Sequence, residues 1–125
     1  YFLSGQKNEA ANAFRKARDL SESRHAVDPT DIDTLFTLAW AQQMLGEHVE
    51  AKASVAKGLA MAPNDPYGLY YEALINVQAG EHALAVKSLR LAVNNGYPAN
   101  MLAAEPYLNE LRANREFRAM ITETH

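Results

Sequence analysis

A repeat with a period of 34 residues constrains this chain more than any other feature of its sequence. The tripeptide Gly46-Glu47-His48 recurs as Gly80-Glu81-His82. The same shift relates small or apolar residues of one segment to those of the next, as in Leu35 and Leu69, Ala39 and Ala73, Ala51 and Ala85. Each unit of a repeat array must bury one face against its neighbours, so these are the positions that a repeat keeps. The period therefore predicts stacked units of like structure.

The apolar residues within each unit are spaced as on one face of an α-helix. Between residues 32 and 45 they fall at steps of three and four, interrupted by Gln42, and a second apolar stripe follows Gly46. Glycine at 46, and again at 80, suits the left-handed conformation that commonly closes a helix. We therefore predict four main helices across residues 31–95, paired as two antiparallel hairpins.

Capping residues indicate where the first helix of each hairpin begins. Thr30, with Asp33 three residues later, resembles a capping box. Asp65 followed by Pro66 gives an N-cap with a proline in the first turn. Such residues satisfy backbone N–H groups that a helix start leaves unbonded, so we expect both first helices to begin directly after them.

The beginning of the chain resembles the second half of another unit. Gly5 and the residues after it follow the pattern seen after Gly46, so residues 1–4 are expected to be the last turn of a missing helix and residues 6–27 its partner. The distance from this glycine to the next proline is 24 residues (5 to 29), against 17 in the full unit (46 to 63). The extra residues equal about two helical turns. The helix through residues 20–27 is therefore expected to be overlong.

With this period, its helix–turn–helix units and its glycines at the turns, the chain resembles the tetratricopeptide repeat family, in particular C-terminal arrays of bacterial regulatory or signalling proteins. The resemblance implies an all-α solenoid of antiparallel helix hairpins, with about two and a half repeats and a C-terminal capping helix. It divides a single domain, residues 1–125, into a partial first repeat with an overlong second helix (1–29), two repeats (30–63 and 64–97) and a non-repeat capping segment (98–125), whose last helix is expected near 114–124.

Composition and missing motifs argue against several functional classes. The chain has no cysteine, and its formal net charge of -3 gives no reason to expect nucleic acid or an anionic membrane as partner. No apolar run approaches the roughly 20 residues of a membrane-spanning helix. Neither His48 nor His82 has a second histidine at metal-ligand spacing, so both are interpreted as solvated residues at helix starts. We therefore predict no enzyme activity, cofactor, metal or membrane insertion, and favour a cytoplasmic location.

The first helices of tetratricopeptide-like units line a concave surface, and in this chain that surface is predicted to be rich in aromatic side chains. Aromatic residues are enriched at protein interfaces, where they provide large contact areas. Relatives that clamp a terminal carboxylate use Lys, Arg and Asn along the same strip, and these are missing here. We predict a groove that binds a peptide or protein partner, formed by Asp33, Phe36, Thr37, Trp40, Met44, Tyr67, Tyr70, Tyr71 and Leu74.

The sequence leaves open what covers this strip. An external partner, the long first helix or the terminal helix of the chain itself, and a second copy of the chain could each bury it. A non-catalytic scaffold for protein–protein interaction is the first prediction. The alternative is a regulatory, sensor or oligomerisation domain of a larger bacterial regulator or signalling enzyme. An enclosed pocket would favour the sensor, and an open groove would favour the scaffold.

Overall fold

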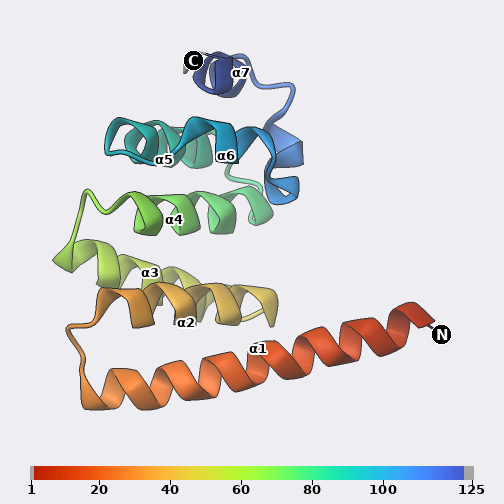
Figure 1. Cartoon of the computed structure of the whole chain (residues 1–125), viewed down its shortest axis with the longest axis vertical. Helices are drawn as coiled ribbons and strands as arrows, with labels where there is room; N and C mark the ends of the chain where they lie inside the picture. The colour runs from red at the N-terminus through yellow and green to blue at the C-terminus, as the bar shows by residue number, and fades with distance from the viewer. Residues whose placement is uncertain (1, 123–125) are drawn as a thin grey trace. The chain divides into compact units, whose positions relative to one another are not determined.

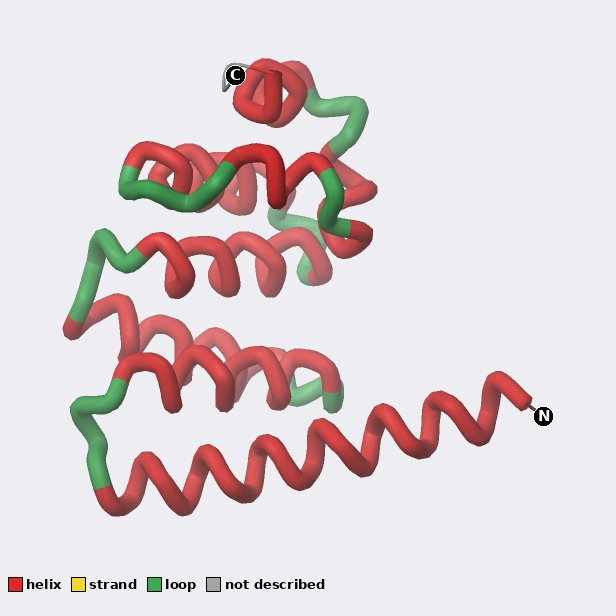
Figure 2. Tube along the Cα trace, viewed as in Figure 1, coloured by secondary structure: helices red, strands yellow, loops and turns green. Residues whose placement is uncertain are grey.

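The computed structural model describes the backbone of residues 2–122 and the side chains of residues 9–122 (Figure 1). All regular structure between residues 2 and 122 is helical, joined by short connections (Figure 2). The chain divides into two compact units, Tyr1–Ala62 and Pro63–His125. The predicted all-α class is confirmed. Among the described helices, none is both long and apolar enough to cross a lipid bilayer.

The first unit consists of a long helix followed by one hairpin. Helix α1 runs over Phe2–Val27, α2 over Ile32–Met44 and α3 over His48–Met61. Gly46, with φ of 83°, closes the turn between α2 and α3, as its position in the repeat predicts. Helix α1 has 26 residues and α2 only 13, so α1 packs along α2 and then extends past its end (Figure 1).

The start of α1 corrects one prediction. Gly5 lies inside the helix, so residues 2–4 are not the last turn of a separate element, and Tyr1 lies outside the described residues. A glycine in a helix interior costs only about 1 kcal/mol relative to alanine. A long helix such as α1 can therefore continue through Gly5, whereas Gly46 and Gly80 follow the ends of the shorter helices α2 and α4. Helix α1 runs without a break to Val27 and is longer than the 14-residue α3; because Pro29 aligns with Pro63 one period later, the extra residues lie before position 14.

The start of α2 corrects a second prediction. Its N-cap is Asp31, whose carboxylate accepts hydrogen bonds from the backbone N–H groups of Asp33 and Thr34. Thr30 instead donates through its hydroxyl and its backbone N–H to Asp28. An aspartate one residue later is an equally good cap, and its carboxylate adds a favourable charge at the positive end of the helix dipole.

The second unit repeats the hairpin and then closes with shorter elements. Helix α4 runs over Pro66–Gln78 and α5 over His82–Asn94. Asp65 caps α4, and Gly80, with φ of 80°, closes the turn, both as predicted. The closing segment comprises α6 (Ala99–Ala103), a 3-10 helix η1 (Pro106–Leu111) and α7 (Arg115–Thr122).

The closing segment has a small core of its own. Helix α7 contacts α5 and α6 and fully buries Phe117 and Met120. The predicted C-terminal capping helix is confirmed. Within the described residues, the side chains of this segment that are at most 1% exposed are Leu102, Leu108, Leu111, Phe117 and Met120.

Side-chain hydrogen bonds of buried serines join the two helices of each hairpin. Gln42, the polar residue in the apolar stripe of α2, accepts a hydrogen bond of 2.7 Å from the Ser54 hydroxyl of α3. Ser88 is the repeat equivalent of Ser54 and donates a bond of the same length to Glu72 of α4. Buried polar groups are costly unless paired, so these bonds explain how both hairpins tolerate polar residues where their helices meet.

Candidate functional site

Four tyrosines gather in the second unit and form what we call the tyrosine cluster: Tyr67, Tyr70 and Tyr71 of α4, and Tyr97 of the connection between α5 and α6. The rings of Tyr70 and Tyr97 stack with centroids 4.6 Å apart and planes inclined by 14°. Tyr67 meets Tyr97 edge-on at 5.7 Å, and Tyr71 lies 5.7 Å from Tyr70. Aromatic pairs contribute about 0.5–1.5 kcal/mol beyond their burial, so the four rings hold one another in place.

Local sequence explains why these rings converge. Residues three and four apart share one face of a helix, which places the first three tyrosines together on α4. After α5, Gly96 adopts a φ of 110° and reverses the chain, and the N–H of Tyr97 donates to the carbonyl of Ala92 at 2.9 Å. This is the bonding pattern of a glycine-closed helix end. It returns Tyr97 to the side of α4.

Glu105 ties the tyrosine cluster to the closing segment. The Tyr70 hydroxyl donates to one carboxylate oxygen of Glu105 at 2.9 Å, and the other oxygen accepts from the N–H of Tyr107 at the start of η1. Burial raises the pKa of Tyr70 well above its usual value, and the bond to Glu105 raises it further. Burial also raises the pKa of Tyr71 and of Tyr97. These hydroxyls are therefore neutral hydrogen-bonding groups at neutral pH.

The tyrosine cluster is fixed at its base and accessible at its outer edge. Tyr97 is 7% exposed, whereas Tyr67 is 60% exposed and Tyr70 and Tyr71 are half-buried. The exposed ring of Tyr67 leans on the buried one. The cluster therefore offers an aromatic surface whose rings contact one another.

A single methyl group explains why Tyr70 stands at this surface while its repeat equivalent does not. Phe36 occupies the same position in α2 but is buried, with its ring against Gly58 of α3. A Cβ at Gly58 would lie 2.9 Å from the ring atom Cζ of Phe36, closer than real Cβ atoms approach. The second hairpin has Ala92 at that place. By the repeat equivalence, the Cβ of Ala92 stands where the ring of Phe36 comes closest to α3, which favours a position outside the hairpin for Tyr70.

The residues that the sequence predicts for the groove differ in their exposure and in their neighbours. Tyr67, Tyr70 and Tyr71 are brought together. The expectation for Phe36 is wrong, because this side chain is 2% exposed in the contact between α2 and α3, and Leu74 is equally buried. In the first unit, exposed Asp33 and Thr37 and half-buried Trp40 and Met44 lie on α2. That all of them line one groove stays a prediction.

Tyr97 and Glu105 belong to the tyrosine cluster but were missed from the sequence. One signal for Glu105 exists: Glu105 followed by Pro106 repeats the pattern of Asp65 followed by Pro66, and Glu105 does cap η1. Tyr97 stands one period after Pro63, where a proline would ordinarily lead into the next hairpin. The replacement of this proline by tyrosine is the sequence signal that could have identified Tyr97.

The histidines and acidic residues of the described part of the chain do not gather into a metal site. No three or more His, Cys, Asp or Glu side chains in the described part of the chain are grouped as metal ligands. His48 is exposed and its Nδ1 lies 2.9 Å from the side-chain oxygen of Gln43, while Nε2 of His82 lies 3.7 Å from a carboxylate oxygen of Glu110. The tyrosine cluster can stack, accept and donate hydrogen bonds, and bury apolar groups.

Comparison with known proteins identifies the fold. No family model matches the chain, and no curated protein is significantly similar to it. Two solved structures of SycD, a type III secretion translocator chaperone of Yersinia enterocolitica, are similar to it at 22% identity. One, described as an alternative dimer, has a TM-score of 0.62 and matches 98% of this chain and 89% of its own. The other, in complex with a peptide of the translocator YopD, has a TM-score of 0.63 and matches 99% and 95%. The chain thus has the tetratricopeptide-like helical repeat fold.

Proposed function

We propose that this chain is a non-catalytic scaffold that binds a peptide segment of a protein partner through the tyrosine cluster. The observation that carries the proposal is an exposed aromatic ring, Tyr67, supported by three further rings and by the carboxylate of Glu105. Tyrosine and tryptophan dominate binding energy at many protein interfaces, because they combine large apolar area with a polar tip. Rings that are ordered before binding lose little conformational entropy when a ligand arrives.

The chemistry of the tyrosine cluster favours a peptide that carries an apolar or aromatic side chain. Such a side chain can stack against Tyr67 and Tyr71, while main-chain groups of the peptide bond to tyrosine hydroxyls. The SycD structure with a bound YopD peptide supports this proposal, because it shows that a chain of this fold can hold a peptide. We also propose a cytoplasmic location for this chain, in keeping with the chaperone role of that neighbour.

Selection from a random-peptide display library tests the proposal. The intact chain should select peptides with a shared apolar or aromatic motif. For a selected peptide, Tyr67→Ala should weaken binding by about 30-fold, the equivalent of an interface hot spot of about 2 kcal/mol. The fold should persist in this variant, since the side chain is 60% exposed.

Two further variants locate the binding surface. Val49→Ala removes another highly exposed apolar side chain from the first unit and should leave binding unchanged, which makes it the matched control. Trp40→Ala tests whether the predicted strip on α2 also contributes, and should lower affinity if it does. The proposal fails if no motif emerges, or if the selected peptide binds Tyr67→Ala as tightly as the unaltered chain.

A further inference from the structure

The repeat period extends backward into α1. The N-cap Asp31 corresponds to the N-cap Asp65, one period later, and Pro29 corresponds to Pro63. The same shift carries residues 14–27 of α1 onto α3 (48–61), and a second shift carries residues 14–26 onto α5 (82–94). Three such sets share one helix face: Ala17, Ala51 and Ala85; Leu20, Ser54 and Ser88; Arg24, Gly58 and Ala92.

This face of α3 and α5 receives the first helix of the same hairpin. All six equivalent residues on these two helices are buried. Ser54 bonds to Gln42 of α2, and Gly58 lies under the ring of Phe36. In the second hairpin, Ser88 bonds to Glu72 of α4. The chain therefore shows twice that a helix occupies this face.

On α1 the same face is largely uncovered, and only Ala17 is part-buried. Leu20 is 53% exposed and Val27 is 86% exposed, and Arg24 and Ala13 on the same face are exposed as well. Helix α2 packs on a different face of α1, where Ser21 is buried. An apolar stripe thus runs along α1 with no covering helix among the described residues of the first unit.

At two positions of this face, α1 has a different residue from the equivalent helices α3 and α5, and these differences indicate what can cover it. Leu20 stands where both hairpins have a serine that bonds to a polar side chain, so the residue opposite Leu20 should be apolar. Arg24 stands where the hairpins have glycine or alanine. A large ring such as Phe36 cannot pack there, whereas a carboxylate could bond to the guanidinium.

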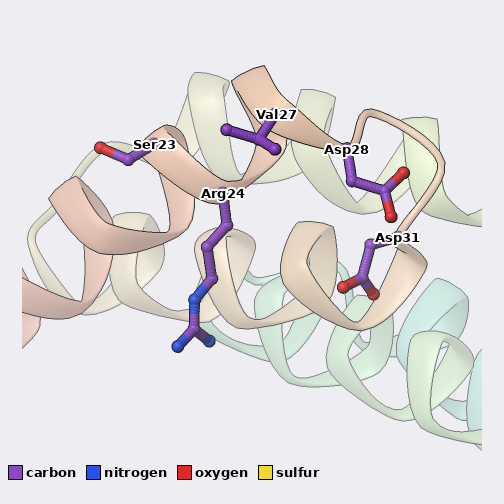
Figure 3. Close-up of a pocket in the computed structure, with 5 residues that line it drawn as sticks. All are labelled: Ser23, Arg24, Val27, Asp28 and Asp31. Carbon is purple, nitrogen blue, oxygen red and sulfur yellow. The ribbon is translucent and has the colours of Figure 1, made fainter.

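Two acidic side chains lie near Arg24, but neither forms an ion pair with it. Arg24 and Val27 line a shallow cleft of about 350 Å³ at the end of α1, with Asp28 and Asp31 on its other side (Figure 3). Both carboxylates accept other hydrogen bonds, Asp28 from Thr30 in the turn after α1 and Asp31 from the start of α2. Between residues 9 and 122, no acidic side chain forms an ion pair with Arg24.

We propose that this face, which we call the α1 docking face (Ala13, Ala17, Leu20, Arg24 and Val27), binds an amphipathic α-helix of a protein partner. The bound helix runs antiparallel to α1, as α2 does to α3. It places an apolar residue against Leu20 and a carboxylate against Arg24. This interaction is separate from peptide binding at the tyrosine cluster and can hold or fail without it.

The chain supplies its own probe. A synthetic peptide of residues 30–46 contains α2, the helix that covers the equivalent face of α3. Phe36→Glu and Gln42→Leu in this peptide replace the groups that meet Gly58 and Ser54 by groups suited to Arg24 and Leu20. A hydrocarbon staple on the opposite face keeps the short helix formed, since isolated helices of this length are marginal in water. Fluorescence anisotropy should show one-to-one binding, at least about 10-fold tighter than that of the stapled peptide without the two changes.

Variants of the intact chain then locate the contact. Leu20→Lys should weaken binding at least about 10-fold. Arg24→Glu should weaken it similarly, and a probe with Phe36→Lys in place of Phe36→Glu should bind this variant better than the unaltered chain. Val49→Lys, at a residue 80% exposed on α3, is the control and should change nothing. Circular dichroism of each variant verifies that its helices are intact.

Three results would overturn the proposal. The two stapled peptides could bind equally well, or binding could persist in Leu20→Lys. Sedimentation could also show that the chain is a dimer which Leu20→Lys dissociates, in which case a second copy occupies the α1 docking face. None of these results affects the peptide selected on the tyrosine cluster, so the two proposals fail independently.

Discussion

Adding one methyl group at Gly58 tests the packing that distinguishes the two hairpins. Gly58 lies in the interior of α3, where replacement of glycine by alanine normally stabilises a helix by about 1 kcal/mol. Here the new Cβ would lie 2.9 Å from Cζ of Phe36, a ring that is 2% exposed and has little room to move. Overpacking of this kind costs about 1–3 kcal/mol. Gly58→Ala should therefore give no gain in stability and up to about 2 kcal/mol of loss.

A double-mutant cycle separates the two effects. In a Phe36→Leu background the ring is gone, so Gly58→Ala should stabilise by about 1 kcal/mol, and the coupling between the two sites should be about 1–3 kcal/mol. Urea denaturation followed by fluorescence measures this, because Trp40, the only tryptophan of the chain, lies on α2 with Phe36. The units of a repeat protein can unfold separately, so far-UV circular dichroism tests whether the rest of the chain unfolds in the same transition. A gain of about 1 kcal/mol in the unaltered background, with coupling below about 0.5 kcal/mol, would refute the reasoning.

Three further predictions test the caps and the tyrosine cluster. Asp31→Ala should lower the unfolding free energy by about 0.5–2 kcal/mol, and Thr30→Ala by less than about 0.5 kcal/mol, because Asp31 caps α2. Urea denaturation measures both losses, and a larger loss for Thr30→Ala would contradict the observed cap. Tyr70→Phe should cost about 1–2 kcal/mol, because it leaves a half-buried carboxylate without its hydroxyl donor, and an unchanged urea midpoint would exclude that bond. Folding raises the pKa values of Tyr70, Tyr71 and Tyr97. These three neutral hydroxyls therefore stabilise the fold fully below pH about 10, the pKa of an unfolded tyrosine, and lose this contribution as the pH rises through their folded pKa values. The urea midpoint should therefore be lower at pH about 11 than at pH about 9. Equal midpoints, together with an absorbance titration in which all tyrosines ionise near pH about 10, would contradict the burial of these three side chains.

The hairpins could be predicted from the sequence because their signals are local. Gly46 and Gly80 determine their turns through a backbone conformation that few other residues adopt, and apolar spacing within 13 or 14 residues determines each helix. The same rule misled at Gly5, where a glycine without a helix pair to close continues inside α1. Local signals thus identify an element and leave its exact ends to competing caps, as the shift from Thr30 to Asp31 shows.

The candidate site could be predicted only in part, because it depends on contacts between distant residues. Tyr70 and Phe36 are equivalent in the repeat, and their different fates follow from Ala92 and Gly58, 22 residues further along each hairpin. The bond from Tyr70 to Glu105 spans 35 residues and depends on a closing segment that has no repeat to align with. Periodicity selects the helix face but cannot rank the residues on it by exposure.

The most direct test of peptide binding at the tyrosine cluster is a nuclear magnetic resonance titration of the chain labelled with ¹³C in its tyrosine rings. The ligand is the peptide obtained by display selection, added to the intact chain. Ring resonances of Tyr67, Tyr70, Tyr71 and Tyr97 should shift together along one saturation curve, because these rings contact one another. Saturable binding that leaves all four unmoved would contradict the assignment of the binding surface to the tyrosine cluster.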